Sequence, residues 1–458
     1  MTYTTGTTIG TELKYRLRGP VWQFGDDGYD QARGVWNNAV DHRPTLVARC
    51  LDGDDLRTAL LVAREREVPL SVRGGGHDWA GRAIREGGLV LDLSALRDVS
   101  IDPRAGVATA QGGALIADLI DPAAVHGLAT STGVVRDVGM AGLTMAGGYG
   151  GLIGRFGLAL DNLISADVLL ADGRTVSAAS DGDPELLWAL RGGGGNFGVV
   201  TSARYRLHRL ESVLAGMVMY PLAQAGQVLQ GYREILASAP DELTVMAGFR
   251  TGPTGDPVVF VAPTWSGDLA VGEVAVAPLS RLGRPVAGGV TAMPYPDLLR
   301  MFDAGMATGN RYALGTRWLT DLTDDAISAL AVGAVTRSSP FSLLVVHQFH
   351  GAATRVASDE TAFALRQDHL LAEVIAAWPS GPTGEDSAFT AAPHREWVDQ
   401  VTSALTPGAL PGGYPNILGP QDGGRVKRGF AGNAERLLAA KRRYDPDGVF
   451  TAIGAITA

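Results

Sequence analysis

The chain has 458 residues, of which 46% are hydrophobic and 19% are charged, and its formal net charge is −9. This length favours two domains over one, and this composition excludes a disordered chain. The acidic balance argues against a nucleic-acid-binding protein, because such proteins usually carry a basic stripe. Cys50 is the only cysteine, which excludes an internal disulfide and a cysteine-ligated metal cluster.

Two further absences bear on where the protein works. No basic and apolar leader follows Met1, and no window holds the roughly 18 to 20 apolar residues needed to cross a bilayer. We therefore expect a cytoplasmic protein that has neither a membrane nor a nucleic acid as a partner. The sequence carries no signal for the oligomeric state.

The predicted elements of the first half alternate between helices and strands. Residues 27–70 are expected to be mainly helical, because Tyr29, Ala32, Val35 and Trp36 recur at helical spacing. Strands are expected at 70–73, 88–93, 106–111, 166–171 and 199–207, a hairpin turn at Asp172-Gly173, and a helix at 183–190 that begins at Asp183 and Pro184.

The composition of the chain changes at about residue 212, because the glycine clusters of the first half do not continue beyond it. Strands such as 257–262 and 341–350 alternate with helical stretches, and a last helix from Asn433 is stopped by Pro446. The predicted fold class is therefore α+β, with a glycine-rich cofactor half, a substrate half and a returning tail.

Glycine is the residue type that departs most from average composition. The chain has 61 glycines, which is about twice the usual frequency of roughly 7%. They cluster at 74–76, 139–154 and 192–198. Because a glycine backbone can pass close to another object, three clusters in the first half indicate one large ligand wrapped by main chain.

The first two clusters each allow a ligand-binding and a structural interpretation. Successive glycine N–H groups after Arg73 can form an anion-binding nest for a pyrophosphate, with His77 beside the ligand. The alternative there is a turn with a hydrogen-bonded histidine. The second cluster, with Thr144 as its only aliphatic hydroxyl, could lie flat along a ligand or pack closely against another element.

The third cluster, 193–198, formally matches the G-x-G-x-x-G pattern. A Rossmann fingerprint needs a strand before it and a helix after it. Here a helix precedes the pattern and a strand follows it, so we reject that interpretation.

Metal and nucleophile sites have little support. His347 and His350 are three residues apart in a predicted strand, where their side chains would point to opposite faces, and no carboxylate pattern accompanies them. We expect no metal. The chain also has neither a G-x-S-x-G elbow nor a P-loop, so hydrolase and nucleotide-hydrolysis functions lose their usual support.

Several stretches, taken together and in this order, carry a resemblance to a known family. They are residues 43–50, 72–78, 89–93, 138–150, 157–162, 187–200, 414–416 and 436–446. The chain resembles the FAD-linked oxidases of the vanillyl-alcohol oxidase (PCMH) superfamily, in their berberine-bridge-enzyme-like branch. The resemblance is very specific in residues 40–210 and thin between 212 and 400.

The resemblance implies a particular domain organisation. A PCMH-type FAD-binding domain, built from two α/β subdomains, would cover residues 1–211, with its core at about 40–211. A central substrate-binding domain, an antiparallel sheet covered by helices, would cover residues 212–410. Residues 411–458 would return to the FAD-binding domain as a berberine-bridge-like tail.

The resemblance also implies the cofactor and the way in which it is held. FAD would be bonded through its 8α-methyl group to His77, and by one bond only, because Val135 replaces the cysteine that forms a second bond in some relatives. Val138 stands where a small side chain is associated with oxygen access, which favours an oxidase. The cofactor-binding residues would be Arg73, Gly74, Gly75, Gly76, His77, Asp78, Gly81, Val138, Gly139, Gly142, Thr144, Gly148, Tyr149, Gly150, Gly198, Val199, Val200 and Asn416.

Hydride transfer from an alcohol or an amine also needs an acceptor for the hydroxyl or amine proton. Relatives use a tyrosine or a glutamate, and Tyr414 matches the tyrosine of their Tyr-x-Asn motif. The strand 341–350 has no carboxylate but contains His347 and His350. Tyr414 and one of these two histidines are therefore the candidate bases.

Three functions follow as hypotheses. The first is an FAD-dependent oxidase that takes hydride from a small alcohol, amine or sugar-like carbon and passes electrons to O2, giving hydrogen peroxide, in secondary or catabolic metabolism. The second is a flavin dehydrogenase or oxygenase that tailors a natural product. The third is a non-catalytic nucleotide-binding protein with the same fold.

Overall fold

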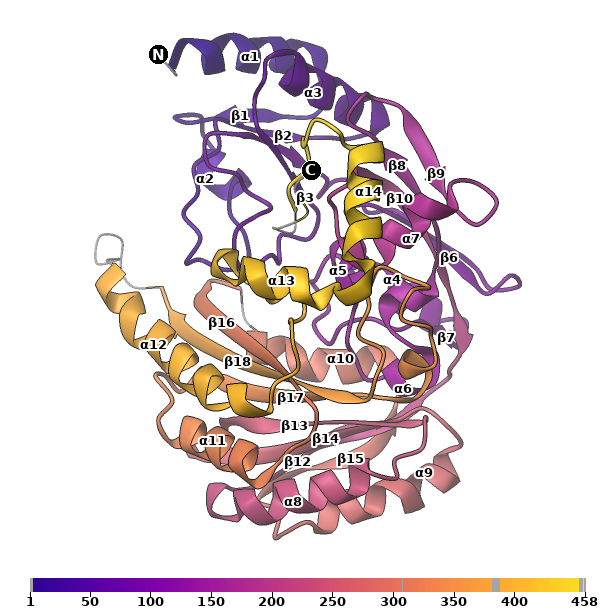
Figure 1. The fold of residues 1–458 in the computed structure, drawn as a ribbon, viewed down its shortest axis with the longest axis vertical. Helices are drawn as coiled ribbons and strands as arrows, with labels where there is room; N and C mark the ends of the chain where they lie inside the picture. The colour runs from indigo at the N-terminus through magenta and orange to yellow at the C-terminus, as the bar shows by residue number, and fades with distance from the viewer. Residues whose placement is uncertain (1–2, 307, 381–387, 453–455, 457–458) are drawn as a thin grey trace.

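Three larger β-sheets and one two-stranded ribbon organise the chain in the computed structural model, which describes residues 3–306, 308–380, 388–452 and 456. Two of the sheets belong to the first half of the chain, and the third belongs to the second half (Figure 1). The helical and strand content, and the antiparallel third sheet, confirm the predicted α+β class.

The first sheet is small and mostly parallel. Its strands lie in the order β1 (Val21–Gln23), β2 (Leu46–Arg49), β4 (Leu89–Asp92), β3 (Leu70–Arg73), with β1 antiparallel to the rest. Helices α1 (Tyr3–Arg16) and α3 (Gly53–Glu65) lie together above it, and α2 (Tyr29–Ala32) lies beside it (Figure 1). Strands buried on both faces explain the unbroken apolar run at 89–91.

The expectation that residues 27–70 are mainly helical was partly wrong. Only α2 and α3 are helical in this range, and β2 is a fully paired strand between β1 and β4. The helix α2 ends at Ala32, and the chain from there to residue 45 is irregular. Leu46 and Val47 are buried in β2, which pairs with β4, a strand remote in sequence. Tertiary pairing therefore overrides the local pattern.

The second sheet is antiparallel, with the strand order β5 (Val99–Asp102), β6 (Val107–Gln111), β10 (Val199–Arg206), β8 (Leu163–Leu169), β9 (Thr175–Ala178). The accompanying helices are α4 (Ile116–Ala124), α5 (Met140–Ala146), α6 (Ile153–Phe156) and α7 (Pro184–Gly193), and β7 (Leu128–Ala129) pairs with β11 (His208–Arg209). The hairpin turn at Asp172-Gly173 is confirmed, with φ of 83° at Gly173. Asp183 caps α7 by accepting from the N–H of Leu186, as predicted.

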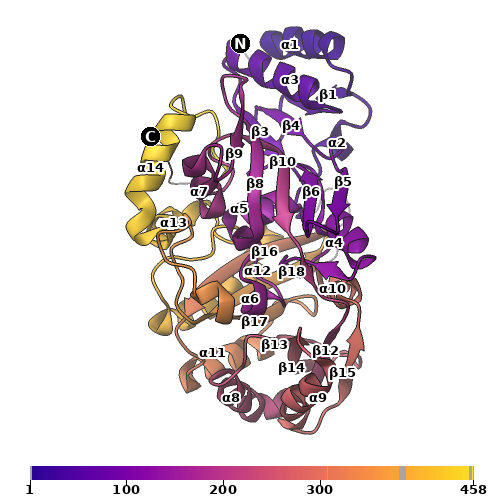
Figure 2. The same cartoon turned by 90° about the vertical axis from the view of Figure 1, so that its right-hand side faces the viewer.

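The third sheet has seven antiparallel strands and forms the floor of the site described below. Their order is β15 (Ala287–Met293), β12 (Val213–Pro221), β14 (Pro257–Trp265), β13 (Leu243–Thr251), β17 (Leu343–Phe349), β18 (His369–Pro379), β16 (Asn310–Leu319). Helices α8 (Ala225–Leu236), α9 (Leu269–Val276), α11 (Asp324–Val335) and α12 (Ala388–Ala404) cover the face that points away from the first half (Figures 1 and 2). The helix α10 (Tyr295–Asp303) instead contacts α4.

Alternation along the strands of this sheet separates two apolar clusters. Val245, Ala247 and Phe249 pack under the covering helices, whereas Met246, one residue out of phase, joins Met217 and its neighbours on the opposite face. A period of two gives each strand one helix-covered face and one face toward the first half of the chain.

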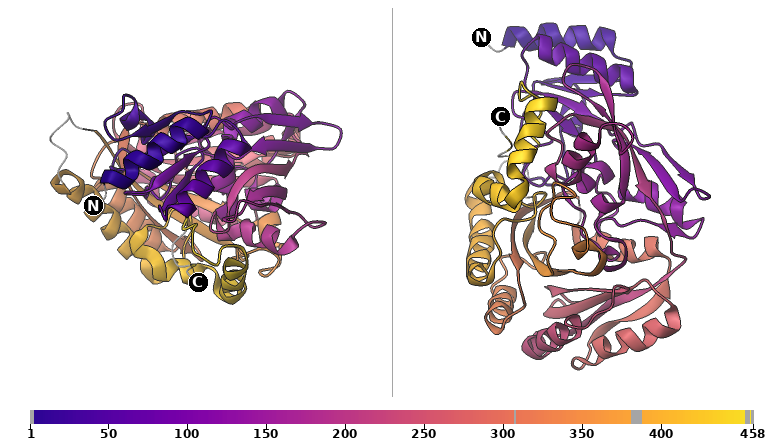
Figure 3. Two further views of the ribbon diagram at one scale, coloured as in Figure 1. Left: turned by 90° about the horizontal axis from the view of Figure 1, so that it is seen from above. Right: turned by 45° about the vertical axis from the view of Figure 1, so that its right-hand side comes forward.

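The tail runs back along the first half, as expected from the resemblance. Helices α13 (Gly423–Gly429) and α14 (Ala434–Tyr444) lie beside it (Figures 1 and 3). The fully buried Lys441 Nζ donates to Asp445, to the carbonyl of Asn196 at 2.8 Å and to the carbonyl of Phe450 at 2.6 Å. One buried ammonium group thus fixes the tail against the third glycine cluster.

Short 3-10 helices connect these elements: η1 (Ala159–Asn162), η2 (Leu222–Gln224), η3 (Ala277–Arg281), η4 (Ala304–Met306), η5 (Gly351–Thr354), η6 (Thr406–Gly408), η7 (Pro420–Asp422) and η8 (Ala431–Asn433). Among the residues with described structure, no helix combines the length and apolar character needed to cross a bilayer.

Candidate active site

A cavity of about 910 Å³ lies between the glycine loops of the first half and the open face of the seven-stranded sheet. This volume is near the upper end of the range for small-molecule and cofactor sites. The first half contributes ten glycines to its wall: Gly74, Gly75, Gly76, Gly112, Gly133, Gly139, Gly142, Gly194, Gly195 and Gly198. The sheet contributes side chains, among them Met217, Met246, Arg250, Phe260, Leu314, Val345, His347, Glu373 and Ile375.

Glycine is required where the first two clusters meet. A Cβ atom placed on Gly75 would lie 2.3 Å from the backbone nitrogen of Gly139, and one placed on Gly139 would lie 2.6 Å from the nitrogen of Gly75. The loop after β3 and the start of α5 are therefore in backbone contact. This contact explains why both segments are rich in glycine. It matches the interpretation in which the second glycine cluster packs closely against another element.

The loop at residues 74–77 has the features of an anion-binding nest. Over the described part of the chain, the backbone N–H groups of these four residues donate to no protein acceptor. All four residues line the cavity, and Gly76 has a φ of 71°. Free successive N–H groups beside a cavity suit a pyrophosphate, so the residues present fit the FAD implied by the sequence.

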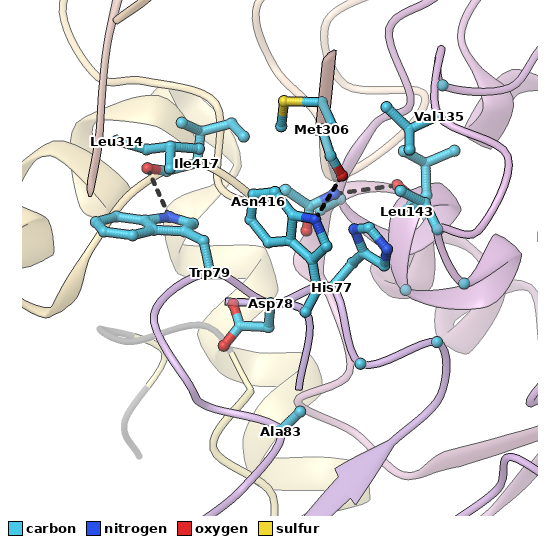
Figure 4. A pocket seen from close by; sticks show the side chains of 18 of the residues that line it. His77, Asp78, Trp79, Ala83, Val135, Leu143, Met306, Leu314, Asn416 and Ile417 are labelled. Carbon is cyan, nitrogen blue, oxygen red and sulfur yellow. Dashed lines mark hydrogen bonds between the residues drawn. The ribbon is translucent and has the colours of Figure 1, made fainter. Parts of the chain in front are cut away.

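His77 is held in a defined orientation at the end of this loop. Its Nε2 lies 3.0 Å from Oδ1 of Asp137, and its ring stacks on Trp36 with centroids 5.1 Å apart. Trp36 in turn stacks on Tyr312 at 3.9 Å and donates from its indole N–H to the carbonyl of Met306. Figure 4 shows His77 among the residues that line the cavity.

Asp137 is ionised in this arrangement. Burial alone would raise the pKa of Asp137, but the hydrogen bond with His77 and the attraction between the two groups outweigh burial and lower that pKa. The ionised Asp137 accepts a hydrogen bond from the N–H at Nε2 of His77. In the neutral imidazole, Nδ1 is then the nitrogen without a proton.

The tail closes one side of the cavity next to the same loop. The indole N–H of Trp79 donates to the carbonyl of Ile417 at 3.1 Å, and Asn416 donates to the carbonyl of Leu143 at 3.3 Å (Figure 4). Asn416 also donates to the Tyr414 hydroxyl oxygen at 3.1 Å. The Tyr-x-Asn segment is therefore fixed against α5.

Tyr414 lines the cavity, but its hydroxyl is already engaged. Its oxygen accepts from the backbone N–H of Gly148 at 3.0 Å as well as from Asn416. Burial raises the pKa of Tyr414 to about 12, and the hydrogen bonds from Gly148 and Asn416 only partly oppose that rise. The phenol is therefore protonated near neutral pH and is more suited to donate a hydrogen bond than to accept a proton.

A histidine and a carboxylate meet on the sheet wall of the cavity. His347 Nε2 on β17 lies 3.4 Å from Oε2 of Glu373 on β18, and both residues line the cavity. Their side chains are 8% and 14% exposed. The sequence analysis found no carboxylate near His347 because Glu373 comes from the neighbouring strand. A single glutamate in the otherwise apolar run of β18 is the signal that could have identified it.

His350 lies outside the cavity. It follows the end of β17, where its Nε2 contacts the hydroxyl of Thr244 at 3.2 Å, and burial lowers its pKa to about 4. The structure therefore separates His350 from His347, as the alternation of a strand predicts. Across the described residues, no group of three or more His, Cys, Asp and Glu side chains could hold a metal ion.

The structure brings most of the sequence-predicted site residues to this one cavity. Those that line it are Gly74, Gly75, Gly76, His77, Asp78, Val135, Val138, Gly139, Gly142, Tyr149, Gly198, Val199, Val200, His347, Tyr414 and Asn416. Residues that the sequence analysis missed include Trp36, Asp137, Arg250 and Glu373. Each of them reaches the site from an irregular segment or from a strand without a motif.

Five predicted cofactor residues do not line the cavity: Arg73, Gly81, Thr144, Gly148 and Gly150. Arg73 donates to the carbonyl of Ala32, and Gly148 donates to Tyr414. A Cβ on Gly150 would lie 2.1 Å from the carbonyl oxygen of Thr132. These five residues therefore lie outside the lining of the cavity. Direct contact between them and a cofactor stays a prediction.

Two family descriptions and several known proteins match the chain. A family described as "FAD binding domain" matches residues 44–179, and one described as "Berberine and berberine like" matches residues 413–456. The chain is 30% identical over 474 residues to an FAD-linked oxidoreductase of Aspergillus terreus, covering 95% of this chain and 93% of that protein. It is 33% identical over 300 residues to the (R)-6-hydroxynicotine oxidase of Paenarthrobacter nicotinovorans, covering 64% and 66%.

Solved structures have the same fold. The 6-hydroxy-D-nicotine oxidase of Arthrobacter nicotinovorans superposes with a TM-score of 0.84 at 27% identity, covering 96% of this chain and 98% of that one. A glucooligosaccharide oxidase of Acremonium strictum, described with a 6-S-cysteinyl, 8α-N1-histidyl FAD, gives 0.83 at 23% identity, covering 98% and 100%. The PCMH-type fold expected from the sequence is confirmed. The chain belongs to the berberine-bridge-enzyme-like family of FAD-linked oxidoreductases.

Proposed function

We propose that the protein is an oxidase that holds FAD covalently through His77. It would oxidise a C–OH or C–NH group of a small molecule and reduce O2 to hydrogen peroxide. FAD, when bound, accepts the hydride and returns the electrons to O2. The observation that carries the proposal is the position of His77, which ends a loop of free N–H groups and lies in the same cavity as the His347–Glu373 pair.

The contact between His77 and Asp137 supports a covalent bond through one particular nitrogen. Because Asp137 holds the Nε2 proton, Nδ1 keeps a free electron pair and can bond to the 8α carbon of the flavin. This nitrogen matches the 8α-N1-histidyl linkage described for the Acremonium strictum relative. A second bond through sulfur is not expected, because Val135 lines the cavity and Cys50 is fully buried in another cluster.

Replacement of His77 tests the tether. In His77→Ala we expect all flavin to be released when the protein is denatured, whereas in the natural protein the flavin should stay with the polypeptide and add the mass of one FAD. Absorbance of the washed precipitate and intact mass measure this. His126→Ala, at an exposed position, is the matched control. Release of flavin from the natural protein would refute the tether but not the FAD site.

Asp137→Asn tests the role of the aspartate in orienting the imidazole. The amide can no longer hold the Nε2 proton as an anion does, so flavin attachment should slow by about tenfold or more while non-covalent FAD binding persists. A time course of covalent flavin after addition of FAD to unflavinylated protein measures this. An unchanged rate would remove Asp137 from the proposal.

We further propose that the His347–Glu373 pair accepts the hydroxyl or amine proton of the substrate. The two groups share the sheet wall and are within reach of each other, so a proton taken by either can be stabilised by the other. Tyr414, which the resemblance suggested, and His350, which the residues of the predicted strand 341–350 offered, fit less well. Tyr414 is protonated near neutral pH and His350 lies outside the cavity.

The small side chain of Val138 at the cavity wall supports an oxidase over a dehydrogenase. The measurement that separates the two is hydrogen peroxide formed for each substrate molecule oxidised under air. A ratio near one is expected. A ratio near zero, with electrons passed to an artificial acceptor instead, would favour the dehydrogenase.

A further inference from the structure

An arginine without an acidic partner lies on the sheet wall of the cavity. Arg250 is the penultimate residue of β13, and it lines the cavity together with Met217 and Phe260 from the neighbouring strands. Thr251, Phe341 and Ser342 line the cavity next to it, at the ends of β13 and of the loop before β17. Arg250 therefore marks one end of the cavity, where the strands of the sheet terminate.

The charge of Arg250 is uncompensated within the described part of the chain. Its one hydrogen-bond contact among the described residues is with the thioether sulfur of Met217 at 3.8 Å, and no carboxylate contributes to the pKa of its guanidinium. Burial lowers the pKa of Arg250, and no nearby charge opposes this effect. A half-buried guanidinium has five N–H donors, and a thioether is a weak acceptor for one of them.

A second guanidinium strengthens the positive potential at this end. Arg337 donates to the hydroxyl of Thr251 and to the carbonyl of Ser342, both at 3.2 Å. Burial also lowers its pKa. Arg337 is thus a second cation held by neutral acceptors, bonded to the residue that follows Arg250, in a chain whose net charge is −9.

Arg366 and Arg82 are paired with carboxylates, whereas the half-buried Arg191, Arg317 and Arg337 form no ion pair within the described residues but do not line the cavity. Arg366 forms two hydrogen bonds with Asp161, at 2.9 and 3.0 Å, and Arg82 at the cavity wall pairs with Asp78. Buried charges are usually compensated, because desolvation is costly. Arg250 departs from this rule at a ligand-facing position, which indicates that the compensating anion comes with the ligand.

We propose that the substrate carries a carboxylate and that Arg250 binds it, with an apolar body lying between that group and the carbon that is oxidised. This inference rests on the proposed oxidase function. Glu373 lies on β18, two strands away from β13, with β17 between them. Neighbouring strands are about 4.8 Å apart, so roughly 10 Å separates the two strands. Met217, Met246 and Phe260 supply the apolar surface at this wall.

The test compares a carboxylate with its neutral amide. The probes are 3-phenylpropionate and 3-phenylpropionamide, titrated into the flavin-loaded protein, with the change in flavin absorbance and the heat of binding as readouts. Charge-assisted hydrogen bonds to guanidinium should make the carboxylate bind about tenfold or more tightly than the amide. Arg250→Met should abolish this ratio and leave the affinity for the amide within about twofold.

Two further variants separate a specific effect from a general one. Arg250→Lys should keep part of the preference, because an ammonium group retains the charge but loses the bidentate geometry. Arg281→Met removes the same charge from an exposed position outside the cavity and should keep the full preference. Because the amide serves as an internal reference, a variant that is merely misfolded loses both ligands and is recognised as such.

Two outcomes would overturn the inference: equal affinity of the natural protein for both probes, or a preference that survives in Arg250→Met. Failure of the proposed oxidase function would look different. It would appear as missing flavin or missing hydrogen peroxide, whereas the calorimetric preference for the carboxylate does not depend on turnover.

Discussion

The two walls of the cavity are built from different parts of the polypeptide. The wall from the first half is rich in glycine, since ten glycines from the loops after β3, β6 and α7 and around α5 line it. The wall from the seven-stranded sheet is made of side chains from β12, β13, β14, β16, β17 and β18. Backbone N–H groups suit the constant part of a reaction, the cofactor, whereas side chains suit the part that differs between relatives, the substrate.

This difference has a consequence for substitutions. A change on the glycine wall should act through close backbone contact, and therefore through cofactor content and stability together. A change on the sheet wall should act on binding or rate and leave the fold intact. Single substitutions on either wall and in the tail test this separation.

Glu373→Gln should have the largest effect on rate. Loss of a positioned proton acceptor typically costs about 10²- to 10⁴-fold, so the rate of flavin reduction under anaerobic conditions should fall by that factor while flavin content is unchanged. Stopped-flow absorbance measures this once a substrate is known. Glu396→Gln, on the exposed side of α12, is the matched control. Unchanged flavin reduction would return the role of base to Tyr414.

Lys441→Met should have the largest effect on stability. The substitution leaves Asp445, which is fully buried, without its cation, and it removes the hydrogen bonds to Asn196 and Phe450. Breaking a buried ion pair from one side costs about 3 to 5 kcal/mol. Urea unfolding should report this loss. A loss below about 1 kcal/mol would mean that solvent reaches the pair.

Gly75→Ala should couple stability to cofactor content. The added Cβ would meet the backbone of Gly139 at 2.3 Å, so the two loops must separate. Overpacking of this kind costs about 1 to 3 kcal/mol, and we expect the ratio of flavin to protein to fall as well. Gly226→Ala in α8, where a Cβ would meet nothing within 4 Å, should instead stabilise the protein by about 0.5 to 1 kcal/mol. Normal flavin content in Gly75→Ala would break the comparison.

One half-buried and two buried histidines predict the acid sensitivity of both halves. Burial lowers the pKa to about 4 for His208 in the first half and for His350 and His369 in the second. The unfolded chain binds these protons near pH 6.5, so stability is complete above pH 6.5 and is lost as the pH falls toward 4. The buried His350 and His369 should each cost about 2 kcal/mol at pH 5, and His208 should cost less because solvent screens it.

Single substitutions tell whether the two halves unfold together. His208→Gln and His350→Gln should each flatten the dependence of the free energy of unfolding on pH between 6.5 and 4, and exposed His126→Gln should leave it unchanged. If the halves form one cooperative unit, both variants change the same transition. Two separate transitions would show that the walls are independent.

The sequence predicts the glycine wall well and the sheet wall poorly, for a physical reason. A backbone nest needs consecutive N–H groups, so its residues are neighbours in the sequence. The pattern at Gly74–His77, and the cluster that begins at Gly139, can therefore be recognised from the sequence alone. Glu373 and Arg250 reach the cavity through strand pairing between β13, β17 and β18, and strand order cannot be read from spacing. Asp137 is similar, because its partner His77 is brought to it by the contact between two loops.

The same reasoning explains the errors in the fold prediction. Strands that alternate or follow glycine turns, such as β3, β10 and β14, were predicted correctly. The β2 strand was missed because its short apolar run does not by itself distinguish a strand from a helix. Its pairing with β1 and β4 on either side makes it a strand. The local sequence pattern predicts an element whose structure is decided by neighbouring residues. It does not predict an element whose structure is decided by pairing with a segment that is remote in sequence.

The tail bears on the order of events during synthesis. Phe450, Thr451 and Ala452 line the same cavity as the loop at residues 74–77, which the ribosome makes long before them. The first half can fold while the sheet is still being translated, but its cavity has no complete wall until Phe450 has emerged and Lys441 has docked. Loading with FAD is therefore expected only after Phe450 has emerged from the ribosome, and a nascent chain arrested before Phe450 should not retain flavin.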